Sequence, residues 1–399
     1  MISRLQPNIG WVIALFSFAI IGPYPLGSFA SLLLPALLLD RQYHQHFELT
    51  AVLLLLIVAL LALGIAFSDD IMRATAAVQR QFTLVILAIL LLLRKPSFPS
   101  NVSPMRFLTL GNVAFSAFCI IVAAVKSFQS GSLHDPVHET HFVYNNFIHQ
   151  NLTGPIGLNA AYLAASCALS ILWLVPKVLK KHQYVSILTF VYLFFVLLLC
   201  KSVMVTVAFS IAFLFNLFWG EQLSYSFHKL KLPVFAALAL IVGWVTATKL
   251  QDFSLEFSYA DPYLRPLQIR LGIWTSAIEK IASEPWFGYG TGDSRAIILD
   301  AYANHSFAIG LENGFNAHNQ FLELWLQIGI AGPLLLLSLF IWRFREAIQS
   351  QAHMVASAVF ILFMLCLTES VLLTFRGVIF FGFCIFLPLK FDHESSAGS

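Results

Sequence analysis

The stretch Ala317–Pro333, with the sequence AHNQFLELWLQIGIAGP, marks the point at which a long polar loop runs into an apolar segment. His318 stands at this junction. Histidine changes its charge near neutral pH, so an imidazole that faces both water and membrane suits a general base acting on a lipid-linked substrate. The alternative is an interfacial histidine that only caps a transmembrane helix. Position alone leaves both interpretations open.

Composition places the chain among integral membrane proteins. Hydrophobic residues make up 59% of the sequence and charged residues 11%, and the mean hydropathy is +0.81. The net charge of +3 is too small, and the basic residues are too scattered, to indicate binding to nucleic acid. The five cysteines lie in or beside apolar runs without a CxxC pair, which predicts small membrane-embedded side chains and no disulfide framework.

Apolar runs long enough to cross a bilayer predict an all-α protein with about twelve transmembrane helices. Small residues after the first run lead directly into a second, so that first run is predicted to be a helix and not a signal peptide. We expect residues 1–399 to form a single polytopic membrane domain. The predicted spans lie near 8–22, 25–39, 50–67, 75–93, 107–126, 154–176, 184–200, 202–220, 232–249, 320–342, 354–374 and 377–390.

The distribution of Lys and Arg predicts the orientation, because cytoplasmic loops carry an excess of these residues. Alternate connections hold most of them, and the residues near both chain ends fall on the same side. Both termini are therefore predicted to be cytoplasmic, and His318 to face the periplasm. Two long loops, 127–153 and 251–319, lie on that outer side. Their length predicts structure and a binding role, especially in the larger one.

A helix is predicted within the larger loop, because Pro266 can begin it and Pro285 end it. Leu267, Leu271, Trp274, Ile278 and Ile281 recur at spacings of four and three, which predicts one apolar stripe. Arg270 falls beside this stripe, about 40° from Trp274 on a helical wheel. A helix lying on the membrane surface would hold the guanidinium at headgroup depth.

Two motifs carry a family resemblance. His318 and Asn319 are followed by nine residues, then Gly329, two residues and Gly332. Upstream, an arginine-containing segment, Arg270–Trp274, precedes the glycine-rich turn EPWFGYGTG at residues 284–292. Both motifs resemble the O-antigen ligase family, whose members share their fold with O-antigen polymerases. The first half of the chain resembles the family only in its hydropathy.

The resemblance implies a GT-C-like membrane glycosyltransferase in the bacterial inner membrane, with its active site facing the periplasm. Such an enzyme transfers a glycan from undecaprenyl pyrophosphate to a sugar hydroxyl of the lipid A-core, with inversion. It implies that His318 is the catalytic base, that Arg270 binds phosphate, and that no metal or cofactor is needed. The sequence contains no DxD triplet, P-loop, GxGxxG or GxSxG motif, which is consistent with a lipid-linked donor.

The family's second arginine corresponds to Lys201, which can neutralise phosphate but lacks the bidentate geometry of arginine. Arg265 and Arg376 are the predicted substitutes, and Asn319 completes the predicted substrate-binding residues. Each basic residue has a plainer alternative. Arg270 is also consistent with an arginine that extends to the interface from an amphipathic helix, and Lys201 with the interfacial end of a helix.

Two carboxylates within the apolar segments are further candidates, because ionisable residues at membrane depth are often functional. For Glu323 we favour a structural role, a hydrogen bond to a neighbouring helix, and Glu369 is left as a functional candidate. In the smaller loop, the spacing of His134, His138 and His141 permits a metal site, although a solvated loop is the preferred interpretation. The segment His149–Asn151, at a helix entrance, is a candidate for the glycan path, with simple capping of the helix as the alternative.

Other functions fit less well. An O-antigen polymerase would use the same donor with a second lipid-linked glycan as acceptor. The His-Asn motif and the moderate loop length favour the ligase. A protein glycosyltransferase of the same superfamily would be longer, with extra domains. A transporter should show repeated halves or paired broken helices, and neither is recognisable in the sequence.

Overall fold

The computed structural model describes residues 17–18, 20–23, 48–93, 103–129, 146–181, 184–219, 258–259 and 266–387. Every regular element in these ranges is a helix, which confirms the all-α class. The predicted spans near 25–39 and 232–249, and most of the span near 8–22, lie outside the described residues. So do Arg265 and the candidate metal ligands of the smaller loop, residues 134–141.

Three helical segments among the described residues are long and apolar enough to cross a membrane: Glu48–Phe67, Pro104–Gln129 and Ala160–Val178. The first comprises α3 (Glu48–Leu63) and the short helix η3 (Gly64–Phe67), the second is α5, and the third lies within α8 (Ala160–Lys181). The structure therefore supports a helical membrane protein. The shorter apolar helices are α9 (Tyr184–Leu199), α10 (Val203–Trp219), α17 (His353–Cys366) and α18 (Phe375–Ile385), and α4 (Ile71–Leu93) is a further long helix.

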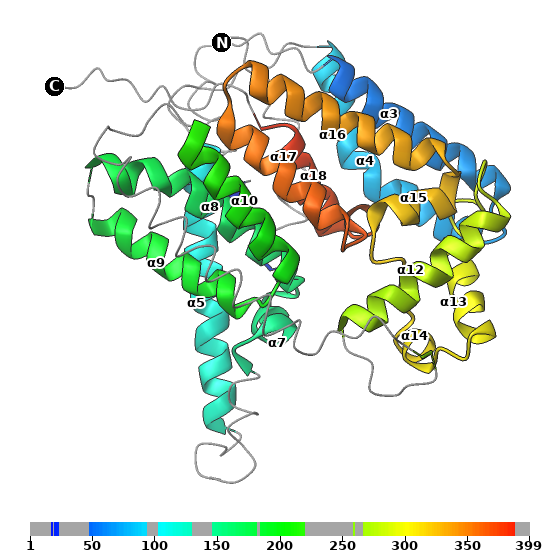
Figure 1. The fold of residues 1–399 in the computed structure, drawn as a ribbon, viewed down its shortest axis with the longest axis horizontal. Helices are drawn as coiled ribbons and strands as arrows, with labels where there is room; N and C mark the ends of the chain where they lie inside the picture. Colours follow the sequence, from blue (N-terminus) through cyan, green and yellow to red (C-terminus); the bar gives the residue numbers. More distant parts are fainter. Residues whose placement is uncertain are drawn as a thin grey trace, which may run out of the picture.

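Helix α8 is the centre of one helix group and packs against α5, α9, α10 and α17 (Figure 1). Its alanines are buried, and such small residues let helix backbones approach closely. One polar group within the apolar core is paired between helices: Asn112 of α5 donates to Ser170 Oγ (2.8 Å) and accepts from Ser166 Oγ (2.7 Å), both on α8. The amide therefore links the two helices without an unsatisfied donor.

A second group contains α3, α4, α16 (Ala331–Gln349) and α18, with α3 and α16 side by side (Figure 1). The fully buried Arg343 of α16 supports the end of α18: its Nε donates to the Ile385 carbonyl at 2.8 Å, and it also donates to Leu387. The same guanidinium pairs with Glu346 at 2.5 Å. Helix-terminal carbonyls and a buried charge thereby satisfy each other.

The predicted span near 320–342 is wrong as a single helix. The segment forms α15 (Gln320–Ile328) and α16, separated at Gly329, whose φ of 69° lies in the left-handed region. A Cβ on Gly329 would lie 1.9 Å from the Trp286 carbonyl oxygen. The backbone of a distant loop therefore packs directly against Gly329, and only glycine fits there.

The predicted span near 354–374 is also interrupted. Helix α17 ends at Cys366, and Glu369 lies in the turn before the short helix η6 (Val371–Leu373) and α18. The non-helical backbone is satisfied by side chains, because Leu372 N donates to Gln320 Oε1 and Leu372 O accepts from Gln81 Nε2, both at 2.6 Å. Irregular backbone among apolar helices requires such partners.

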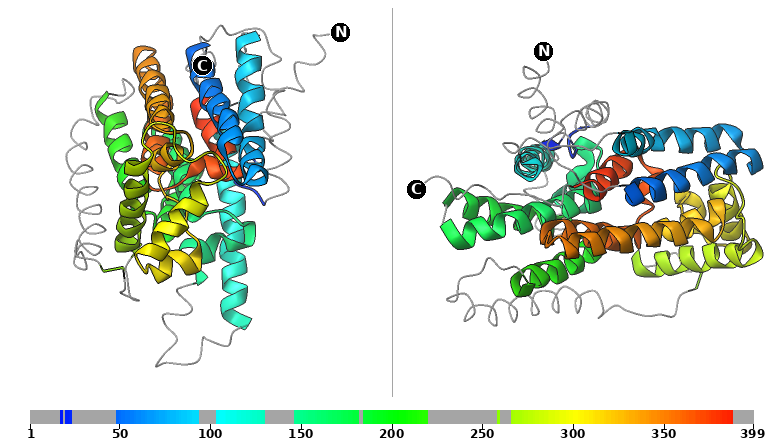
Figure 2. Two further views of the ribbon diagram at one scale, coloured as in Figure 1. Left: turned by 90° about the vertical axis from the view of Figure 1, so that its right-hand side faces the viewer. Right: turned by 90° about the horizontal axis from the view of Figure 1, so that it is seen from above.

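A layer of helices, α12 (Pro266–Ser283), α13 (Ser294–Asn304), α14 (Ala308–Asn313) and α15, gathers at one end of the molecule (Figures 1 and 2). We call it the loop layer. The helix predicted between Pro266 and Pro285 is confirmed. Its predicted stripe is divided: Leu267 and Ile278 are exposed, whereas Ile281 is buried among α12, α13 and α15. The inward face uses small residues beside Ile273, namely Gly272, Ser276 and Ala277.

The glycine-rich turn at 288–292 links the loop layer to the end of α3 through hydrogen bonds. Thr291 Oγ1 donates to the Leu61 carbonyl (2.7 Å), and Gly292 N donates to Ser68 Oγ (2.9 Å). The Asp293 carboxylate accepts from the amides of residues 69 and 70 at 2.8 and 3.0 Å. The glycines permit this approach, since a Cβ on Gly292 would lie 2.2 Å from the Asp70 carbonyl oxygen.

We predict that Gly292→Ala lowers the free energy of unfolding by about 1–3 kcal/mol, because the new methyl group overpacks a backbone contact. Thermal unfolding of the detergent-solubilised protein measures the change. Gly154→Ala is the matched control, because a methyl group added at Gly154 would meet no neighbouring atom within 4 Å. Equal melting temperatures for the two variants would contradict the proposed close packing.

Candidate functional site

His318 is held immediately before the first turn of α15. Asn319 caps this helix, and its side-chain oxygen accepts from Phe321 N (2.9 Å) and Leu322 N (3.2 Å). The backbone of His318 is left-handed, with φ 42°, and its amide donates to Asn316 Oδ1 at 2.8 Å. Phe315 meets the imidazole edge-on at 5.4 Å. A histidine in this uncommon conformation is fixed by its surroundings, which defines the direction of the ring.

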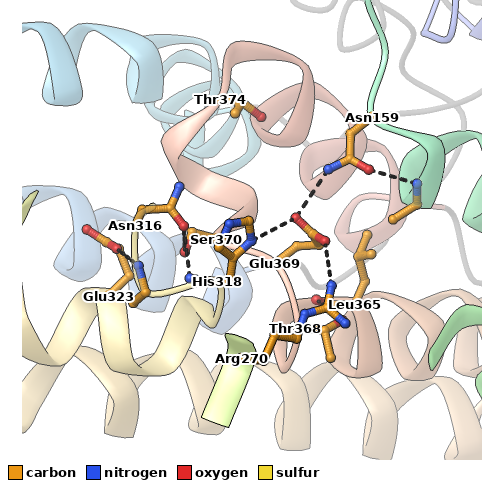
Figure 3. A network of polar contacts seen from close by, with 12 residues as sticks. Asn159, Arg270, Asn316, His318, Glu323, Leu365, Thr368, Glu369, Ser370 and Thr374 are labelled. Atoms are coloured by element: carbon orange, nitrogen blue, oxygen red, sulfur yellow. Dashed lines mark hydrogen bonds and ion pairs between the residues drawn. The ribbon is translucent and has the colours of Figure 1, made fainter. Parts of the chain in front are cut away.

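The imidazole points toward Glu369 (Figure 3). His318 Nδ1 lies 3.7 Å from Glu369 Oε2, and Arg270 donates to Glu369 Oε1 at 3.3 Å. Asn159 Nδ2 donates to Oε2 at 3.2 Å. One carboxylate therefore lies between a guanidinium, an imidazole and an amide. We call these four residues the Glu369 cluster.

Four separate segments supply the Glu369 cluster. Asn159 precedes α8 and also accepts from Ala161 N (2.9 Å), so its amide is oriented by the start of that helix. Arg270 comes from the first turns of α12, and Glu369 from the break between α17 and α18. The Glu369 side chain is 12% exposed, whereas the Arg270 side chain is 35% exposed. The guanidinium can therefore contact both the carboxylate and a ligand from solvent.

A second carboxylate, that of the buried Glu323, supports the backbone segment that carries His318. Glu323 accepts hydrogen bonds from Ser294 Oγ (2.8 Å), from the backbone N of Ala317 (3.2 Å) and from Gln327 Nε2 (3.2 Å). The predicted hydrogen bond to a neighbouring helix is confirmed, since Ser294 belongs to α13. Glu323 thus ties the residue before His318 to two helices of the loop layer.

The other predicted site residues lie on several separate elements. Arg376 is the second residue of α18 and is buried. Lys201 lies exposed in the turn between α9 and α10, with φ 49°. The Asn319 oxygen is used by the helix cap, which leaves only its amide nitrogen for the predicted contact with substrate. His149 opens the short helix α7 (His149–Thr153), and its place on a glycan path stays a prediction.

The sequence analysis named Glu369 as a functional candidate without assigning it a role, and it did not identify Asn159. A signal for Glu369 was present, namely a carboxylate within an apolar run. Asn159 carries only the weak signal of a polar residue before an apolar helix, which also describes ordinary capping. No cluster of three His, Cys, Asp or Glu side chains suited to a metal ion occurs within the described ranges.

The fold and the Glu369 cluster define a helical membrane protein with a histidine, a carboxylate and an arginine gathered at breaks between helices. Residues 185–337 match the family model described as O-Antigen ligase, and this match supports assignment of the chain to the O-antigen ligase family. The matched region includes Lys201, Arg270 and His318. The assignment supports a glycosyltransferase-like enzyme of ligase or polymerase type. No curated protein matches the chain.

We predict that Glu323→Ala lowers the free energy of unfolding by about 3 kcal/mol, because it leaves the Ala317 amide and two side-chain donors without their acceptor. Scanning fluorimetry in detergent measures the shift in melting temperature. Glu312→Ala, at an exposed position of α14, is the control. An unchanged melting temperature for Glu323→Ala would show that the buried carboxylate does not hold the histidine segment.

Proposed function

We propose that this protein is an O-antigen ligase, which transfers a glycan from undecaprenyl pyrophosphate to a sugar hydroxyl of the lipid A-core at the periplasmic face of the inner membrane. The family match supports the reaction type. The observation that carries the proposal is the approach of His318 Nδ1 to Glu369, with Arg270 on the other carboxylate oxygen. A histidine and a guanidinium on the same carboxylate support the proposed roles of base and phosphate-binding group.

His318 acts as the base for the acceptor hydroxyl. With Nδ1 directed at Glu369, the pairing favours the tautomer that carries its proton on Nδ1, so Nε2 is free to accept a proton. The imidazolium that then forms is stabilised by the adjacent carboxylate, as in other histidine–carboxylate pairs. The 3.7 Å contact is longer than a hydrogen bond. The contacts of catalytic bases are often long in the absence of substrate and shorten when the substrate binds.

Arg270 binds the pyrophosphate of the donor. Guanidinium presents several N–H donors in a planar fork, and only one contact to Glu369 is made on one of its nitrogens. The remaining donors suit phosphate oxygens, where charge develops as the glycosidic bond breaks. Lys201 and Arg376 are proposed to add positive charge, with Arg265 as a further candidate.

The reaction is proposed to be a single displacement. The acceptor oxygen attacks the anomeric carbon as the bond to the pyrophosphate oxygen breaks, the hydroxyl proton passes to His318, and the electron pair leaves on the pyrophosphate. This step inverts the anomeric configuration and needs no covalent enzyme intermediate. A product with retained configuration would contradict the mechanism.

We predict that Glu369→Gln lowers the turnover rate of the purified enzyme by about 100-fold, within the range expected for loss of acid–base function. The amide keeps the size of the side chain but removes the charge that orients His318 and pairs with Arg270. Glu369→Asp should recover part of the rate. Glycan transfer at saturating acceptor gives the measurement, and Glu312→Gln is the surface control. Full activity in Glu369→Gln would remove the carboxylate from the mechanism.

We predict that His318→Ala abolishes ligation. The test is lipopolysaccharide electrophoresis of a ligase-deficient strain that supplies a matching donor and core, carrying the intact protein or the variant at equal membrane level. A ladder should form only with the intact protein and with the control His305→Ala, which alters a histidine paired with Glu279 outside the Glu369 cluster.

A different outcome would favour the polymerase. If the intact protein restores no ladder in the ligase-deficient strain but restores long chains in a polymerase-deficient strain, the acceptor is a second lipid-linked glycan. The ligase proposal would then be wrong, although the roles proposed for His318 and Arg270 would remain open to the same test in that strain.

A further inference from the structure

Two adjacent aromatic side chains project from the loop layer. Trp286 is 71% exposed and Phe287 is 85% exposed, and both lie in the turn that follows α12. Large aromatic groups are seldom this exposed side by side unless they contact a partner. The function proposed for the Glu369 cluster gives them no role, since they come from a different part of the loop layer.

The backbone on both sides of the pair is fixed. The Pro285 carbonyl accepts from Ile330 N (3.0 Å) and from the Trp325 indole nitrogen (2.9 Å). After the pair, Tyr289 N donates to the Leu326 carbonyl at 2.7 Å. The turn that carries the two rings is therefore hydrogen-bonded on both sides of the pair, to the end of α15 and to Ile330 after it. This defined backbone is the reason that both rings are exposed.

The same turn is bonded to the end of a membrane-spanning segment. Its Thr291 hydroxyl donates to the Leu61 carbonyl, within the apolar segment Glu48–Phe67. Further exposed apolar side chains occur at this end, with Phe67 at 73% and Met72 at 86% exposure. The turn that carries the aromatic pair is thus bonded close to the end of that apolar segment.

The helices bonded to the turn carry further exposed apolar side chains. On α3 they include Leu56 and Leu63, and on α16 they include Leu334 and Ile341. Carboxylates gather beside the turn, because Asp293 accepts from the amides of Asp69 and Asp70. An apolar surface that ends at a polar rim with a tryptophan is typical of the boundary between acyl chains and headgroups.

We propose that Trp286 and Phe287 form an interfacial anchor that inserts into the phospholipid of the surrounding bilayer at the boundary between headgroups and acyl chains. The partner is lipid, because the turn that carries the pair is bonded to the apolar segment Glu48–Phe67 and to the start of α16, and both of these helices expose apolar side chains. The anchor fixes the height of the turn, and with it the end of α12 and the α15–α16 connection that is bonded to the turn. It sets the depth of the loop layer relative to the membrane.

The test uses the intact chain reconstituted in vesicles of phosphatidylcholine brominated at either shallow or deep acyl positions. The chain has eight tryptophans, so the Trp286 signal is taken as the difference between the intact protein and Trp286→Phe. We expect bromine at the shallow position to quench this difference signal at least twofold more than bromine at the deep position. Aqueous iodide should quench it weakly.

A second variant excludes a local effect of Trp286→Phe as the source of the difference signal. In Trp286→Phe with Phe287→Trp the indole moves by one residue, and its signal should show the same preference for shallow bromine. Strong quenching by iodide with none by either lipid would overturn the proposal, because the pair would then face water. Protection from all three quenchers, together with a dimer in detergent that the Phe287→Ser variant loses, would overturn it in favour of a second copy of the chain.

Discussion

The Glu369 carboxylate imposes the constraint on which the candidate site depends. A negative charge that is almost enclosed by helices is costly unless cationic and hydrogen-bonding groups surround it. Here the partners are Arg270, His318 and Asn159, which come from three other parts of the chain. Their convergence fixes the first turns of α12, the start of α8 and the segment before α15 relative to one another. The break between α17 and α18 gives the carboxylate access to all three, and side chains of other helices satisfy the backbone of that break.

Elements that depend on local sequence were predictable. The apolar runs near 107–126 and 184–200 correspond to α5 and α9, and the helix between Pro266 and Pro285 corresponds to α12. The breaks at Gly329 and after Cys366 were not predictable, because they depend on contacts between residues far apart in the sequence. Gly329 ends α15 where the Trp286 carbonyl approaches it, and an apolar sequence alone continues through this point. The family motifs indicated His318 and Arg270, whereas Asn159 lies 210 residues from Glu369, and no local pattern connects them.

The charges of the Glu369 cluster clarify why a further cation matters. With a neutral imidazole, the positive charge of Arg270 and the negative charge of Glu369 sum to zero. A pyrophosphate would therefore meet a polar but formally neutral site, and its binding would depend on additional positive charge. We expect Lys201 and Arg376 to matter for this reason. Lysine at the first of these positions supplies charge without the bidentate geometry of arginine, so directional binding is expected to depend on the proposed arginines.

A reaction between two lipid-anchored substrates adds a condition that a soluble enzyme does not meet. In the proposed ligase reaction both substrates are anchored in the membrane, so the heights of His318 and Arg270 above the acyl chains would decide whether the two groups can react. A displacement of about 1 Å can cost 100-fold in rate when catalysis depends on positioning. The glycine turn is bonded to the end of α3, and the segment just before it is bonded to the α15–α16 connection. The fold therefore links the helices that carry Arg270 and His318 to the end of a membrane-spanning segment. Such a link would set the heights of the two side chains, and so affect the reaction rate, without contacting either substrate.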